Sequence, residues 1–162
     1  MTRWLDDEEM RAWRALVDVT AAVRAALEAE LVEQHGITEG DYAVLVHLSE
    51  APGRSLRMCD LAWQLHLSPS GLTRRLDGLV KLGFVAREPV ADDRRVTLAV
   101  LTHAGQAALE AAAPLHVDGV RRYVLDHLTR RQIQALGASL DAIRAGNAPK
   151  CDEARAAFDD AT

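Results

Sequence analysis

Residues 67–83, LSPSGLTRRLDGLVKLG, constrain the fold most, because they carry a start signal, a helical period and a stop signal. Ser68 is a favoured N-cap residue, and Pro69 suits the first helical position. Gly83 suits the residue that follows a helix. Four leucines recur at helical spacing: Leu72, Leu76, Leu79 and Leu82. We therefore predict an amphipathic helix over residues 69–82 with these leucines facing inward.

The segments around this helix predict a compact unit. A short helix is expected over residues 58–65, separated from the next helix by a tight turn. After Gly83 the period changes, and residues 84–89 and 96–101 are β-rich runs around a polar loop at 90–95, which indicates a β-hairpin. Two helices joined by a tight turn and followed by two strands define a winged helix-turn-helix.

Longer helical patterns flank this unit. Apolar residues recur at spacings of three and four from Trp13 to Leu31, which predicts one helix over residues 6–34. At about 1.5 Å per residue it would run on the order of 40 Å, more than one small core covers. We therefore expect it to pack partly against a second subunit.

Further helix starts are marked by capping residues. Thr38 with Asp41 and Thr129 with Gln132 each have the spacing of a capping box. Thr102 is a favoured N-cap residue for a long helix over residues 103–128.

Composition excludes several classes of protein. The chain has 162 residues, 49% of them hydrophobic, which suits one globular domain. It has no membrane-spanning apolar stretch, no apolar leader and only two cysteines, so we expect a cytoplasmic protein without a disulfide framework. The net charge is −5, yet residues 51–95 carry +3 while residues 1–50 carry −7. A locally basic surface attracts phosphates regardless of net charge, although such an asymmetry is often only a solvated face.

The helix over residues 69–82 has features that suit DNA. Free N–H groups at its start suit a phosphate, small residues allow close approach to a groove, and arginine suits the two acceptors of guanine. Six residues fall on its other faces or at its flank: Ser70, Gly71, Thr73, Arg74, Asp77 and Arg75. A serine-led start with two arginines also occurs on many solvated surface helices.

The loop ADDRRV, residues 91–96, adds to this pattern. Arg94 and Arg95 at a hairpin tip could enter a minor groove, where negative potential is concentrated. Asp93 would orient Arg95 while Arg94 points outward. A solvated charged turn is the alternative.

Residues 42–105 resemble the winged-helix core of the MarR family of transcription regulators, through the motifs LRMCDLA, LVKLGFVAR, DDRR and LTHAG in that order. The resemblance implies a mainly α fold with a small β-hairpin wing, in a homodimer that binds pseudo-palindromic double-stranded DNA operators and usually represses transcription. We take as predicted DNA-binding residues Arg57, Ser68, Ser70, Gly71, Thr73, Arg74, Arg75, Asp93, Arg94 and Arg95.

The resemblance also implies a division of the chain. We expect an N-terminal dimerisation helix over residues 1–36, a winged helix-turn-helix DNA-binding lobe over 37–101, C-terminal dimerisation helices over 102–147 and a flexible tail over 148–162.

A finer resemblance is to the PecS-like, urate-responsive branch, through LSEAPGRSLRM, AVLTHAG and AAAPLHVDGVRRYVLDHLT. It implies a small anionic, phenolic or purine-like ligand bound by Trp13, Arg75 and Arg87. Tryptophan can stack on a planar purine, and arginines can pair with its anionic edge. The acid of that signature has no match, because Ala43 stands at the aligned position.

Two alternatives stay open. Cys59 near a helix start could sense oxidation, although a buried small hydrophobe is the commoner role of such a residue. The acidic net charge would also suit a winged-helix protein-interaction module that does not bind DNA. The sequence contains no catalytic, phosphate-loop or metal-ligand motif, so we expect no enzyme, no cofactor and no metal site.

Overall fold

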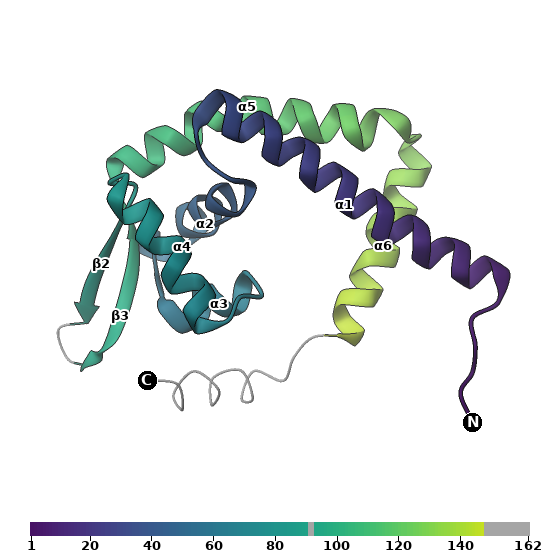
Figure 1. The fold of residues 1–162 in the computed structure, drawn as a ribbon, viewed down its shortest axis with the longest axis horizontal. Helices are drawn as coiled ribbons and strands as arrows, with labels where there is room; N and C mark the ends of the chain where they lie inside the picture. Colours follow the sequence, from purple (N-terminus) through teal and green to yellow (C-terminus); the bar gives the residue numbers. More distant parts are fainter. Residues whose placement is uncertain (91–92, 148–162) are drawn as a thin grey trace.

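The computed structural model describes residues 1–90 and 93–147, with side chains for 1–90 and 96–147. The predicted tail over 148–162 lies outside the described residues. The elements, in chain order (Figure 1), are α1 (Asp7–His35), α2 (Glu39–Glu50), the 3-10 turn η1 (Pro52–Arg54), β1 (Ser55–Arg57), α3 (Met58–Gln64), α4 (Pro69–Lys81), β2 (Val85–Val90), β3 (Asp93–Leu101), α5 (His103–Tyr123), the 3-10 turn η2 (Leu125–His127) and α6 (Arg130–Gly146).

The chain forms a lobe carried by long helices. Figure 1 shows α2, α3, α4 and the sheet gathered at one end, while α1 and α5 extend away from them and α6 turns off at the far end of α5. The described residues form a mostly helical fold with a small antiparallel sheet, which confirms the expected fold class.

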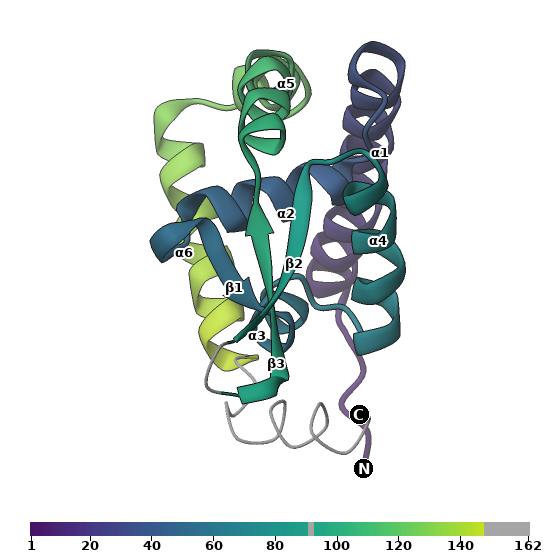
Figure 2. The ribbon, with the colours of Figure 1, turned by 90° about the vertical axis from the view of Figure 1, so that its left-hand side faces the viewer.

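The sheet has one strand more than the sequence predicted. Its order is β1-β3-β2, with Leu56 of β1 opposite Ala99 of β3 (Figure 2). β1 has only three residues, too few to show an alternating pattern. β3 begins at Asp93, so the loop predicted over 90–95 is shorter than expected. Strand pairing continues into the polar residues of that segment, where Val90 is paired with Asp93.

The core lies inside the lobe. Leu72, Leu76 and Leu79 of α4 are fully buried against residues of α2 and α3 such as Leu45 and Leu61. The prediction that Leu82 also faces inward is wrong. Leu82 is the C-cap residue of α4 and is 53% exposed. At about 100° of rotation per residue, it falls roughly 90° away from the side that the three buried leucines share.

The ends of the helices follow the local signals in the sequence. Capping boxes open α2 at Thr38 and α6 at Thr129, as predicted. Gly36, with φ of +67°, ends α1 in the left-handed conformation that glycine adopts readily. The long helix predicted over 103–128 is shorter, because α5 ends at Tyr123 and Val124 leaves helical geometry with φ of −131°.

Candidate nucleic-acid interface

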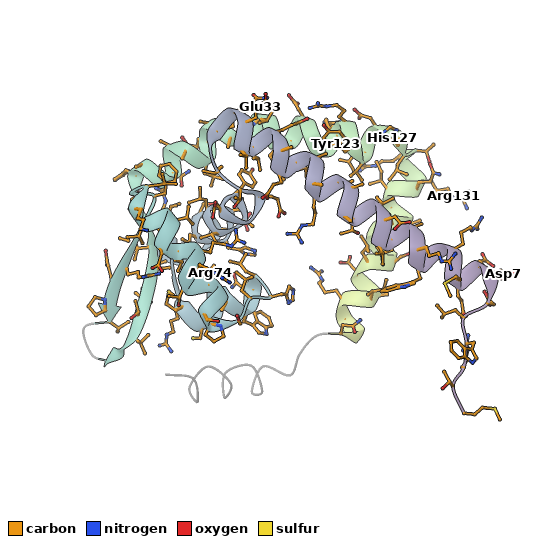
Figure 3. All side chains as sticks on the ribbon, viewed as in Figure 1. Asp7, Glu33, Arg74, Tyr123, His127 and Arg131 are labelled. Carbon is orange, nitrogen blue, oxygen red and sulfur yellow. The ribbon has the colours of Figure 1, made fainter. Side chains whose placement is uncertain are left out.

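The start of α4 is built by its cap. Ser68 Oγ accepts a hydrogen bond from the Gly71 N–H at 3.1 Å, and Pro69 occupies the first turn. The three buried leucines fix the rotation of α4 about its axis, so Thr73 and Arg74 are exposed on its outer side. Figure 3 labels Arg74 on this helix within the lobe.

The hydroxyl groups on this surface are held by local hydrogen bonds. Thr73 Oγ1 donates to the Pro69 carbonyl oxygen at 3.0 Å, and the Ser68 and Ser70 hydroxyl oxygens lie 3.3 Å apart. Arg74 makes no ion pair with any described residue, so its guanidinium remains available. An exposed arginine on a capped helix can pair with base edges or phosphates.

Arg75 points in a different direction, toward the first turn of α2. Its Nη1 donates to Thr38 Oγ1 at 3.2 Å and lies 3.5 Å from Asp41 Oδ1, and its side chain is 31% exposed. The guanidinium lies over Gly40, where a Cβ atom would come within 2.0 Å of Nη1. Asp41 is therefore an acidic partner on α2, two residues before the aligned Ala43. The capping-box pattern was its only signal in the sequence.

The first turn of α2 also contacts α1 and α5. Glu28 of α1 accepts the Glu39 N–H at 2.9 Å, and Arg24 of α1 forms an ion pair with Glu39 at 2.8 Å. On the next turn, Tyr42 stacks on His116 of α5 with ring centroids 4.4 Å apart. Together with Arg75, these contacts connect α4 to the long helices through one short segment.

The remaining predicted DNA-binding residues lie around the sheet. Arg57 is exposed at the end of β1, opposite Leu98 of β3. The side chains of Asp93, Arg94 and Arg95 lie outside the described residues, so their predicted role in the wing stays a prediction.

The three predicted ligand residues lie on three elements, and within the described part of the chain no hydrogen bond or ion pair joins any two of them. Trp13 is 57% exposed on the N-terminal half of α1. Arg75 contacts α2, whereas Arg87 of β2 contacts α4. Their common role in ligand binding stays a prediction.

Cys59 has an environment that disfavours the thiolate. Burial raises the pKa of its thiol, and the neighbouring Asp60 carboxylate raises that pKa further. Because the thiolate is the reactive form, a raised pKa does not favour a role in sensing oxidation.

Two further observations concern other classes of site and partner. Across residues 1–90 and 93–147, no three His, Cys, Asp or Glu side chains gather as metal ligands. None of the helices described combines the length and apolar character that crossing a membrane requires.

Two helices joined by a tight turn and followed by the antiparallel strands β2 and β3 make this chain a winged helix-turn-helix protein. Residues 35–96 match the sequence model of the MarR family. The structure superposes on Sco3205, a MarR family transcriptional regulator from Streptomyces coelicolor solved in complex with DNA, with a TM-score of 0.88 and 35% identity over 93% of this chain and 94% of that one. The chain belongs to the MarR family of transcriptional regulators, and it is not an enzyme.

Two other transcriptional regulators are also similar to this chain. AbsC, a MarR family transcriptional regulator from Streptomyces coelicolor, superposes with a TM-score of 0.83 and 37% identity over 90% of this chain and 97% of that one. The HTH-type transcriptional repressor YetL of Bacillus subtilis is 29% identical over 72% of this chain and 69% of its own length.

Proposed function

We propose that the protein is a ligand-responsive transcriptional repressor that binds a pseudo-palindromic DNA operator as a homodimer. In this proposal residues 37–101 form the DNA-binding lobe, and α1, α5 and α6 form the dimerisation part. The observation that carries the proposal is the outer face of α4. Thr73 and the free Arg74 are exposed there, in a fold shared with a relative solved on DNA.

Dimerisation is supported by apolar side chains that one chain leaves uncovered. No residue of α6 is buried, and Leu136, Leu140 and Ile143 form an exposed stripe along one side of it. Trp13, Leu16 and Val17 are exposed in the same way on α1. Contiguous apolar surface of this kind marks an interface. A two-fold partner would bring two α4 helices to one face, about 34 Å apart, the repeat of one DNA turn.

Sedimentation equilibrium tests the dimer. Leu140→Glu places a charge in the exposed stripe and should give monomers, whereas Gln134→Glu on the opposite side of α6 should leave the dimer intact. A monomeric unaltered protein at micromolar concentration would contradict the proposal.

Operator binding is tested by selecting DNA fragments, including the region upstream of the protein's own gene, and measuring affinity against salt. Contacts to phosphates make log affinity fall steeply with log salt. Arg74→Ala should relax sequence preference at one position by about 1–3 kcal/mol, and Arg94→Ala should weaken binding to all sequences. Arg131→Ala, at the start of α6 and far from Arg74 in Figure 3, is the matched control. Salt-independent or absent DNA binding would favour the protein-interaction module instead.

A response to a small anionic or purine-like ligand is supported by the placement of Arg75. Its guanidinium already binds an oxygen acceptor and a carboxylate on α2, so an anion competing for it would release α4 from the segment that contacts α1. A ligand that prefers the released state weakens DNA binding by its differential affinity. Titration of urate, then of aromatic acids, into the protein–operator complex tests this. Unchanged binding up to millimolar ligand would exclude those compounds.

A further inference from the structure

Arg87 joins the first wing strand to α4. It lies on β2, opposite Ala99 of β3. Its Nη1 is 2.8 Å from Asp77 Oδ1, and its Nη2 donates to the Thr73 carbonyl oxygen at 2.9 Å. Thr73 and Asp77 are one helical turn apart, so a single guanidinium spans one turn of α4.

These two contacts fix position more than they add stability. The side chains of Arg87 and Asp77 are 32% and 51% exposed, so solvent screens their ion pair. The bond to the Thr73 carbonyl supplies a second fixed point. The planar guanidinium holds both donors in one geometry, which a lysine ammonium cannot do.

The contact spans the short connection between α4 and β2. Only residues 82–84 connect α4 to β2, and Gly83 among them has φ of +74°. On one side of the junction, Thr73 and Arg74 are exposed on the proposed base-reading surface. On the other side, β2 leads toward the predicted arginine tip of the wing. Arg87 therefore lies between two surfaces that are both expected to meet DNA.

We propose that Arg87 is a positioning residue for DNA binding, which holds the wing and α4 at the separation at which both contact one operator half-site. The inference rests on the proposed function, because it gives Arg87 a part in operator binding.

The test measures operator affinity over a range of salt for Arg87→Gln, Arg87→Lys and, as a matched control, Arg131→Gln. Both substitutions of Arg87 should weaken binding by about tenfold, a typical size for loss of a coupling contact, because neither side chain makes both bonds to α4. The slope of log affinity against log salt should be the same in Arg87→Gln and Arg87→Lys, because Arg87 itself makes no phosphate contact that a lysine could restore. The control should bind as the unaltered protein does.

A double-mutant cycle adds a measurement that a merely structural role would not affect. When Arg94→Ala has removed the predicted wing contact, Arg87→Gln should cause little further loss, because Arg87 acts through the wing. Independent residues would give additive losses. Melting temperatures establish that each variant folds. If Arg87→Gln does not fold, the same cycle is measured with Arg87→Lys in its place.

Three results would overturn the inference while leaving the proposed function in place. The first is a salt slope that falls by about one in Arg87→Gln and is restored in Arg87→Lys, because that pattern marks a phosphate contact. The second is additive losses in the double-mutant cycle. The third is undiminished operator affinity in both variants of Arg87. If the unaltered protein binds no operator at any salt concentration, the proposed function fails and the inference fails with it.

Discussion

Replacing Gly105 by alanine tests how closely α5 packs against the wing. Gly105 lies in the first turn of α5, and its N–H donates to Thr102 Oγ1 at 3.0 Å. The Thr102 hydroxyl lies 2.7 Å from the Gly83 carbonyl oxygen, and the Thr102 N–H donates to the Phe84 carbonyl oxygen at 3.1 Å. A Cβ atom at Gly105 would lie 2.1 Å from that Phe84 oxygen and 2.8 Å from Leu101 Cδ1.

The size of the effect follows from these contacts. The Phe84 carbonyl is backbone, so it cannot rotate away, and α5 must move from β2 by about 1 Å to reach ordinary contact distance. Overpacking of this kind costs about 1–3 kcal/mol, and each stretched hydrogen bond costs about 1 kcal/mol more. The better helix propensity of alanine offsets about 0.5–1 kcal/mol of this cost. We expect a net loss of about 2 kcal/mol, or roughly 4–8 °C in melting temperature for a chain of this size.

Thermal unfolding followed by circular dichroism, at one fixed protein concentration, measures this loss. Gly78→Ala is the matched control, because it is the same substitution within α4 and no heavy atom lies within 4 Å of the added Cβ. It should raise stability by about 0.5–1 kcal/mol. The reasoning is refuted if Gly105→Ala melts at or above the temperature of the unaltered protein, or if both variants lose stability equally.

Three other outcomes are expected. His66 has φ of +53°, a left-handed conformation that strains any residue except glycine. His66→Gly should therefore raise the stability by up to about 1 kcal/mol in the same melting assay, and an unchanged or lower melting temperature would contradict this strain. Burial lowers the pKa of His116 in the folded protein. The neutral imidazole therefore contributes to folding stability above about pH 6.5, and this contribution is lost as the pH falls through the pKa of the folded state. His116→Phe, which keeps the ring stacked on Tyr42, should therefore lose less stability between pH 7 and pH 5 than the unaltered protein, and equal losses would exclude His116 as the source. The hydrogen bond to Glu30 raises the pKa of Tyr123, so the stability that this hydrogen bond contributes is lost only as the pH rises above about 10. An ultraviolet absorbance titration should show that Glu30→Gln lowers the pKa of Tyr123.

Features determined by neighbouring residues could be predicted from the sequence. Thr38, Ser68 and Thr129 open helices because their side chains accept hydrogen bonds from N–H groups three residues ahead. The spacing of Leu72, Leu76 and Leu79 gave the buried face of α4 correctly, so it also gave the exposure of Arg74.

Features determined by distant segments could not be predicted. β1 exists because β3 pairs with it, some 40 residues along the chain, and its three residues carry no pattern of their own. The contacts of Arg75 with Thr38 and Asp41 were not predicted, because the sequence marks those two residues only as a helix cap. The residue types were visible, but the choice of partner depends on packing.

The order of the strands has a mechanical consequence. β3 lies in the middle of the sheet and is hydrogen-bonded to β1, which leads directly into α3, and to β2, which follows α4. The ladder on each side of β3 thus ties both ends of the helix pair to one strand, so the lobe resists bending within itself. In the proposed homodimer, we therefore expect the spacing of the two lobes to change by rotation where each lobe joins α1 and α5, near Gly36 and Thr102.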